Sequence, residues 1–239
     1  MRLGFCPSVV KEQAECDNSS AMTSKRSIFS FAVFVLAILG AGYCADDAPS
    51  KMTHLVAQMS GDGIAPDSFA AKPKLMWRAS NRYCRMDEEP DPEHGIHGRL
   101  VVNEPDAWLV NLQDNTAQHM VDTGPTFNCK MPMFAFDKDA LKTKVGELEF
   151  GRELDFFRSH GAKLVEGPKL SFDANYYALP IEGARLMLVE RMDIHAPIRV
   201  ILIRGDKQNT VKYLLWDDQV PFKGDLFAKP SGVTIKEIQ

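Results

Sequence analysis

The chain has 239 residues, of which 45% are hydrophobic, 25% charged and 9% aromatic, a composition typical of globular proteins rather than of disordered or fibrous chains. Its formal net charge is −4, and Lys and Arg occur in no run longer than a pair. This pattern excludes a basic surface that follows a phosphate backbone, so nucleic acid is not an expected partner.

The N-terminal segment has the order of features of a secretory signal peptide. Lys25 and Arg26 precede an apolar run over residues 28–42, and small residues and then acids follow. The run is shorter than the ~20 residues of a membrane-spanning helix, which disfavours the alternatives of a membrane anchor or a buried helix. We therefore expect residues 1–45 to be a signal peptide and the mature protein to be exported to the periplasm, where it could associate with the outer membrane.

Two details of this segment leave alternatives open. Met22 stands directly before the charges, so the true start is expected there and residues 1–21 are interpreted as an extension. Lipidation at Cys44 is disfavoured, because the bulky Tyr43 precedes it where a small residue is expected.

Two cysteines remain in the mature chain, Cys84 and Cys129. In an oxidising compartment a pair is more often bridged than free, so we predict a disulfide between them. The alternative is two separate buried thiols, which differs from a disulfide in the Cα separation.

Residues 46–72 mix Asp, Ala, Pro, Ser and Gly and contain the breaker cluster SGDGIAP, which indicates an extended linker or a short helix. The folded domain is expected over residues 73–239. Its first element is KLMWRASNRYCRMD, which alternates over residues 74–87 and predicts one long strand.

Three short alternating segments follow in GRLVVNEPDAWLVNLQDNTAQHMVDTGP. They cover residues 98–103, 107–112 and 116–122 and are separated by turn-forming residues. Short turns join antiparallel neighbours, so this stretch predicts a β-meander.

One main helical region is predicted over residues 137–161. Asp137 or Asp139 can cap its start and Gly161 its end, and an apolar stripe runs between them. Gly146 and Gly151 weaken the helix and indicate a division into two pieces.

After Gly161 the chain returns to strand-like segments that continue to residue 238. The count of nine or ten strands to one helical region predicts an α+β fold. Its architecture is expected to be a strongly curved antiparallel sheet, an open half-barrel, packed around that helical region.

The chain contains none of the common motifs of nucleophilic, zinc-dependent or phosphate-binding enzymes, so no catalytic residue, metal ligand or cofactor is assigned. The best metal candidates, His94 and His97, stand in the acidic stretch EEPDPEHGIHG, for which a solvated loop is the favoured interpretation. The carboxylates of Glu147, Glu149 and Glu153 are interpreted as the polar face of the helix rather than as acid/base groups.

Several late strands carry apolar residues on both faces, which indicates either a strand buried on both sides or one that lines a hydrophobic cavity. Periodicity does not distinguish a filled interior from an empty one. Strand parity and size select seven candidates for a cavity lining: Trp77, Trp108, Val110, Leu188, Ile201, Ile203 and Leu215.

The order of these features resembles the outer-membrane lipoprotein carrier superfamily, the LolA/LolB-like fold. The meander, the helix after it, and the closing stretch IRVILIRGDKQNTVKYLLWDDQVPFKGDLFAKPSGVTIKEI carry the resemblance. Its tail is similar to the family's LF..P.G pattern, here at Leu226, Phe227, Pro230 and Gly232. The resemblance covers residues 74–239 and implies an open half-barrel whose hydrophobic cavity receives acyl chains.

Three functions follow, in decreasing order of preference. The first is non-enzymatic binding of a lipid or an acylated protein, in which burial of each CH₂ contributes about 0.8 kcal/mol. The second is an envelope protein-interaction or stress-sensing domain that docks a protein partner on the same sheet. The third is a metal-assisted enzyme that uses His94 and His97.

Overall fold

The computed structural model describes residues 48–121, 129, 131–134 and 138–238. The predicted signal peptide lies outside the described residues, as does Asp122 at the end of the predicted meander.

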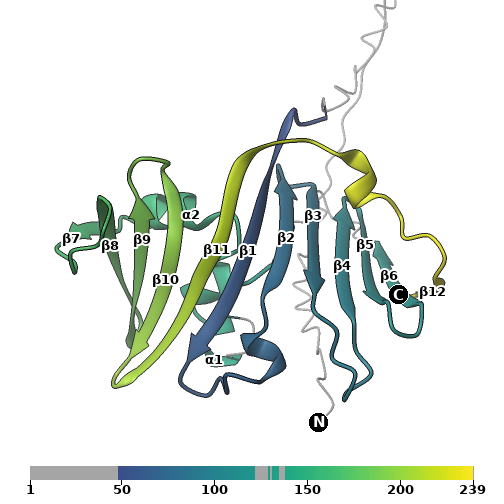
Figure 1. Cartoon of the computed structure of the whole chain (residues 1–239), viewed down its shortest axis with the longest axis horizontal. Helices are drawn as coiled ribbons and strands as arrows, with labels where there is room; N and C mark the ends of the chain where they lie inside the picture. Colours follow the sequence, from purple (N-terminus) through teal and green to yellow (C-terminus); the bar gives the residue numbers. More distant parts are fainter. Residues whose placement is uncertain (1–47, 122–128, 130, 135–137, 239) are drawn as a thin grey trace, which may run out of the picture. The chain divides into compact units, whose positions relative to one another are not determined.

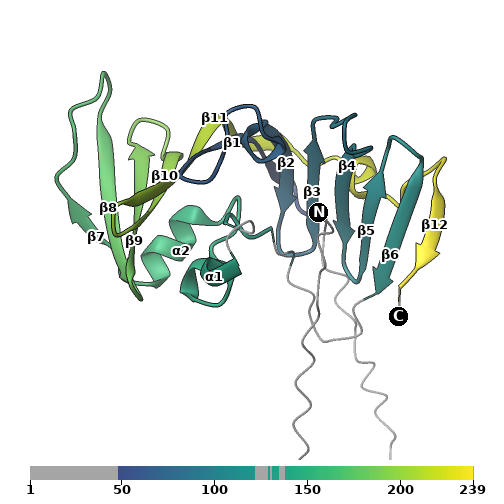
Figure 2. The ribbon, with the colours of Figure 1, turned by 90° about the horizontal axis from the view of Figure 1, so that it is seen from below.

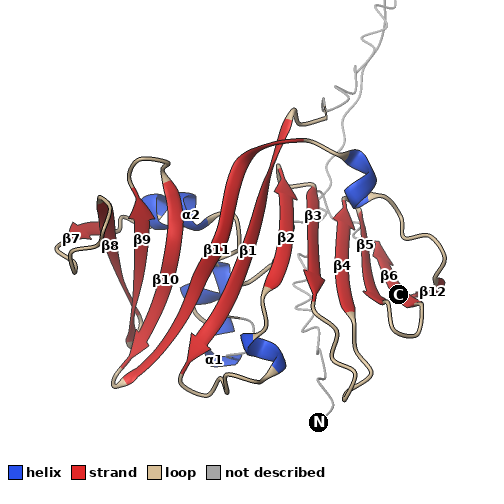
Figure 3. Ribbon diagram, viewed as in Figure 1, coloured by secondary structure: helices blue, strands red, loops and turns tan. Residues whose placement is uncertain are grey.

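Twelve strands form a single sheet in the order β12-β6-β5-β4-β3-β2-β1-β11-β10-β9-β8-β7 (Figures 1 and 3). All neighbouring pairs are antiparallel except β12 and β6, which are parallel. The sheet is not closed, because β12 and β7 stand at opposite edges. The strands are β1 (Lys51–Gly61), β2 (Lys74–Ala79), β3 (Tyr83–Glu88), β4 (Gly98–Asn103), β5 (Asp106–Asn111), β6 (Thr116–Val121), β7 (Lys163–Val165), β8 (Ala174–Ile181), β9 (Ala184–Arg191), β10 (Ala196–Arg204), β11 (Lys207–Pro221) and β12 (Thr234–Glu237).

Helical structure in the described part of the chain is short. It consists of two α-helices and three 3₁₀ turns: α1 (Lys138–Leu141), α2 (Glu153–Ser159), η1 (Phe69–Ala71), η2 (Lys144–Glu147) and η3 (Gly224–Phe227). The fold is therefore mainly β, and it is consistent with the predicted open half-barrel.

The predicted meander is confirmed as β4, β5 and β6, with bounds shifted by about one residue. The predicted helical region is confirmed in place but divided into α1, η2 and α2. Gly151 contributes to this division: its φ of +78° is a left-handed conformation, and a Cβ there would lie 3.2 Å from the Arg78 side chain.

Two predictions at the start of the domain were wrong. Residues 51–61, predicted as part of a linker or a short helix, form β1, which lies between β2 and β11 near the centre of the sheet. The alternation of Leu55, Ala57 and Met59, all buried on one face, is the signal that the flanking breaker residues obscured.

The single long strand predicted over residues 74–87 is a hairpin of β2 and β3. Ser80 adopts a φ of +53° at the turn. Asn81 follows it, and both residue types favour turns because their short polar side chains bond to the nearby backbone; the Ser80 Oγ accepts from the Arg82 N–H at 3.2 Å.

The sheet has two unlike faces. On one face, which we call the helix face, Leu55, Met76 and Leu188 pack into a single core with the buried side chains of the helical region. Figure 2 shows α1 and α2 on this side of the sheet. The opposite side, the outer face, carries two smaller apolar clusters.

One of these outer clusters consists of Val101, Trp108, Val110 and Ala117 on β4, β5 and β6. The other contains Met52, Ala79 and Phe227, and Trp77 and Tyr83 pack against it. Phe227 belongs to η3, so the chain returns over the outer face before it adds β12 at the edge of β6.

Candidate functional site

The helix face over β8, β9, β10 and β11 is filled by the helical region. Leu148 and Phe157 are fully buried in the same cluster as Leu186, Leu188 and Val200. Because these side chains interdigitate, this part of the helix face is a packed core.

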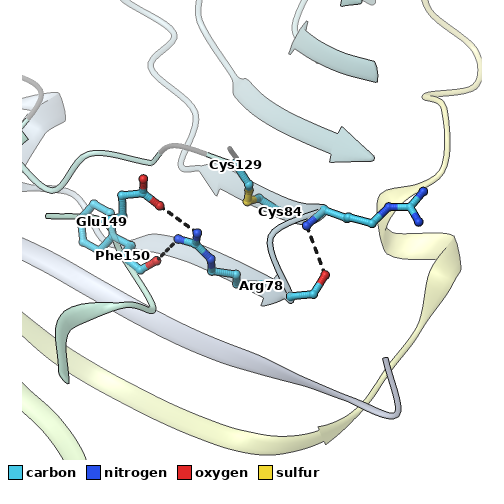
Figure 4. The surroundings of a disulfide bond; sticks show 7 residues. Arg78, Cys84, Cys129, Glu149 and Phe150 are labelled. Carbon is cyan, nitrogen blue, oxygen red and sulfur yellow. Dashed lines mark hydrogen bonds and ion pairs between the residues drawn. A yellow bond between two sulfur atoms is a disulfide. The ribbon is translucent and has the colours of Figure 1, made fainter. Parts of the chain in front are cut away.

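A buried ion pair attaches the helical region to β2, and a cysteine pair lies between β3 and Cys129, which precedes that region in the chain (Figure 4). The Arg78 guanidinium donates to the Glu149 carboxylate at 2.8 Å and to the Phe150 carbonyl at 2.9 Å. Cys84 on β3 and Cys129 are both buried, and their Cα atoms lie 6.1 Å apart, a separation that a disulfide can bridge. The disulfide itself remains a prediction.

Glu153 is a fully buried carboxyl group on α2. One carboxyl oxygen, Oε1, accepts from the Gly151 N–H at 2.8 Å and from the Tyr213 hydroxyl, while Oε2 has no hydrogen-bond partner. Burial raises the pKa of Glu153 to about 7, although the hydrogen bonds and Arg78 act in the opposite direction. This group therefore joins the helix to β11 best in its protonated form.

A second buried carboxylate, Glu190 on β9, lies among hydrogen-bond donors. Asn175 and Tyr177 donate to it at 3.1 and 2.8 Å, and His195 Nδ1 lies 3.3 Å away. Burial tends to raise the pKa of Glu190, but the bonds from Asn175, Tyr177 and His195 outweigh it and lower the pKa. Glu190 is thus a stably ionised carboxylate that joins β8 to β9.

The helix face continues beyond the packed core onto β4, β5 and β6. Buried Val102 and Ala107 belong to the main core, and partly buried Leu100 packs against it. Further out on the same face, Leu109 is 52% exposed and Met120 is 43% exposed. Leu109 pairs directly with Leu100, and Met120 with Ala107, and directly paired residues share a face. We call Leu100, Leu109 and Met120, which lie beside the buried Val102 and Ala107 on the same face, the open apolar face.

This open apolar face was missed by the sequence analysis. Leu109 alternates with Trp108 and Val110, and the larger aromatic side chain led to the choice of the opposite face. The signal that identifies the face is that Leu100 and Leu109 stand directly opposite each other in the β4–β5 hairpin and so point to the same side of the sheet.

The structure does not bring the seven predicted lining residues together. Leu188 lies on the helix face inside the packed core. The other six belong to the outer face: Trp108 and Val110 lie in one apolar cluster, Trp77 packs against the other, and Ile201, Ile203 and Leu215 lie further along the sheet. Their role in ligand binding stays a prediction.

Trp77 and its neighbours form a polar–aromatic surface on the outer face. The ring stacks on His54 with the centroids 4.9 Å apart, and the Arg85 guanidinium lies 5.3 Å from the Trp77 ring. Arg85 and Arg99 both donate to Asp87. Burial acts to raise the pKa of Asp87, but these two arginines outweigh it and lower the pKa. Two guanidinium groups thus share one carboxylate on this surface, and the buried His54 Nε2 beside Trp77 has no hydrogen-bond partner.

The two metal candidates, His94 and His97, make separate contacts. His94 Nδ1 lies 2.8 Å from Asp91, and the backbone N–H of His97 donates to Asn111. Within residues 48–121, 129, 131–134 and 138–238, no cluster of three or more His, Cys, Asp or Glu side chains is placed to hold a metal ion.

A hollow of about 380 Å³ lies beside the end of β1. Its lining contains both polar and apolar residues. They are Gln58, Met59, Ser60, Gly61, Ile64, Pro66, Ala71 and Lys212. It lies on other strands than the open apolar face. In the part of the chain that the structure describes, no helix has the length and hydropathy required to cross a bilayer.

No known family model and no curated protein matches the chain. Solved structures that it resembles include an uncharacterised conserved protein from Thermus thermophilus, at 11% identity over 79% of this chain and 91% of that chain, with a TM-score of 0.46. A LolA superfamily protein from Nitrosomonas europaea is similar at 11% identity over 77% and 91% of the two chains, with a TM-score of 0.33.

A further similar structure is a complex of MucA and MucB from Pseudomonas aeruginosa, at 11% identity and a TM-score of 0.40. The match covers 75% of this chain and 56% of that chain, so this protein spans little more than half of its length. The similar structures thus include a member of the superfamily that the sequence resembles.

Proposed function

We propose that this chain is an exported, non-enzymatic binding protein of the cell envelope that receives an acyl chain, from a lipid or an acylated protein, on the open apolar face. The observation that supports the proposal is the exposure of Leu109 and Met120 on a sheet face that is continuous with the core. An exposed apolar patch of this kind marks an interaction site in a water-soluble protein.

The energetics fit an acyl chain. Each CH₂ transferred from water to an apolar surface contributes about 0.8 kcal/mol, so a long chain binds with no polar contact. The flexible Met120 side chain, which is exposed on this face, can adapt to a mobile ligand.

The first experiment is native mass spectrometry of the protein exported to a periplasm and purified without detergent. We expect a bound mass that disappears on extraction with organic solvent and whose fragments identify an acyl species. Protein that carries no acyl species, and that also fails to bind a fluorescent fatty acid, would overturn the proposal.

A point substitution locates the site. Leu109→Asp places a charge on the open apolar face and should weaken binding of a fluorescent fatty acid at least about tenfold, because the charge would be desolvated by the ligand. The matched control is Leu164→Asp on β7, which changes a leucine that is 64% exposed at the other end of the sheet. Equal binding by the two variants would place the ligand elsewhere.

The second candidate is docking of an envelope protein partner on the same face. The packed core under α1 and α2 favours it, because the described apolar surface is an open face rather than an enclosed cavity. Under this alternative the purified chain carries no lipid, and Leu109→Asp abolishes capture of the protein partner while Leu164→Asp does not.

A further inference from the structure

His119 on β6 lies between two carboxylates that come from different strands. Its Nε2 lies 2.7 Å from Asp106 Oδ1 on β5, and its Nδ1 lies 2.5 Å from Glu237 Oε2 on β12. The imidazole also stacks on the Trp108 ring, with the centroids 5.2 Å apart and the planes within 11° of each other. We call His119, Asp106 and Glu237 the latch.

The latch geometry depends on the charge of the imidazole. A neutral imidazole has one N–H donor and one acceptor nitrogen, so it can donate to only one of the two carboxylates. The imidazolium has two donors and satisfies both, and the Trp108 ring face also favours the cation. Only the protonated ring therefore donates to both carboxylates at once.

The surroundings of His119 also favour the protonated imidazole, because they raise its pKa. Burial tends to lower the pKa, but the hydrogen bonds and charges of Asp106 and Glu237 outweigh it and raise the pKa above its ordinary value. Those two carboxylates are the charged groups that face the ring from the described strands on either side of β6. Lys236 is adjacent to Glu237 but lies on the opposite face of β12, because side chains alternate along a strand.

The latch holds an element that is otherwise weakly attached. β12 has four residues, stands at the edge of the sheet and pairs in parallel with β6 as its one neighbouring strand. Its backbone contributes bonds such as Thr234 N–H to the Asn115 carbonyl at 2.8 Å. Three of its four residues are exposed, and Ile235 is partly buried. So short a strand at a sheet edge has little stability of its own.

β12 also covers an apolar surface. Val233 and Ile235 pack against the outer-face cluster that contains Trp108 and Val110. If β12 leaves, this cluster becomes exposed and β6 becomes an unpaired edge strand, which is a ready template for an added strand.

We propose that the latch is a pH-sensitive device in which protonated His119 holds the C-terminal strand β12 on β6, and loss of the proton releases it. The hold is complete below the pKa of His119 in the released state, near the ordinary value of about 6.5. It is lost as the pH rises through the higher pKa of the latched state. Release would uncover an apolar docking edge in the more alkaline range. This inference does not depend on the proposed acyl-binding function.

Amide hydrogen exchange of the full chain, followed by mass spectrometry between about pH 5 and pH 9 and corrected for the intrinsic exchange rate, tests the proposal. In the wild type we expect the protection of peptides that contain β12 to fall at least about tenfold across this range. Peptides from β10, in the middle of the other half of the sheet, should keep their protection and serve as the internal reference.

Two variants make the test specific. His119→Gln cannot carry a charge and should expose β12 at every pH. Glu237→Gln, at the exposed end of the chain, leaves the fold intact and should remove most of the pH dependence. The matched control, His94→Gln, changes a largely exposed histidine that also contacts one carboxylate. It should behave as the wild type. Protection of β12 that is independent of pH, or unchanged in Glu237→Gln, would overturn the proposal.

Discussion

Replacing Cys84 and Cys129 together by alanine is expected to lower the free energy of unfolding by about 4 kcal/mol. The two residues are 45 positions apart, and closing a loop of that length restricts the unfolded chain by about this amount in the chain-entropy model. For a domain of this size the melting temperature should fall by roughly 8 to 16 °C. Chemical denaturation of both proteins, under oxidising conditions, measures the difference.

The wild type under reducing conditions is the control for this prediction. Alanine fills nearly the same buried space as a free cysteine, so the reduced wild type and the double variant should differ by no more than about 1 kcal/mol. Equal stability of the oxidised wild type and the double variant, together with two titratable thiols in the denatured wild type, would rule out the disulfide.

Glu153→Gln is expected to stabilise the protein above neutral pH and to have little effect in acid. The pKa of Glu153 is raised from 4.5 to about 7, so the folded state binds this proton more tightly than the unfolded state does. Stability from this group is therefore highest below about pH 4.5, falls as the pH rises to about 7, and is constant above it. The difference corresponds to about 3 kcal/mol.

The quantity to measure is the difference in unfolding free energy between wild type and Glu153→Gln at each pH. Carboxylates with a lowered pKa, such as Asp87 and Glu190, make stability rise with pH, but they do so equally in both proteins. Their contributions therefore cancel in the difference, which isolates Glu153. Tyr213→Phe removes a donor to Glu153 and should steepen the loss of stability with pH. A difference that does not change between about pH 4.5 and pH 8 would show that Glu153 ionises normally.

The two predictions concern neighbouring parts of the chain. Cys129 lies beside Cys84 of β3, the Arg78–Glu149 ion pair attaches the following helical region to β2, and Glu153 attaches that region to β11.

Alternation and turn chemistry in the sequence alone determined the meander, most of the later strands and the place of the helical region. These features are local: a period of two residues, a turn-forming pair or a glycine acts within a few positions. The same reasoning failed at β1, where the breaker residues that flank it outweighed a real alternation, and at Ser80, where one residue divides a strand into a hairpin.

The partner of each strand and the occupant of each face were decided only by the tertiary structure. Alternation identifies two faces of a strand but not which of them meets the helical region. The sequence analysis therefore selected Trp108 as a lining residue, whereas Leu109 is the residue on the helix face. In the sequence Glu153 has the pattern of a solvated helix residue. Its contact with β11 is not local, because that strand begins at Lys207, 54 residues further along the chain. The latch likewise joins Asp106 and Glu237 through a histidine that no local pattern connects with either, since long-range pairing is set by the packing of the whole sheet.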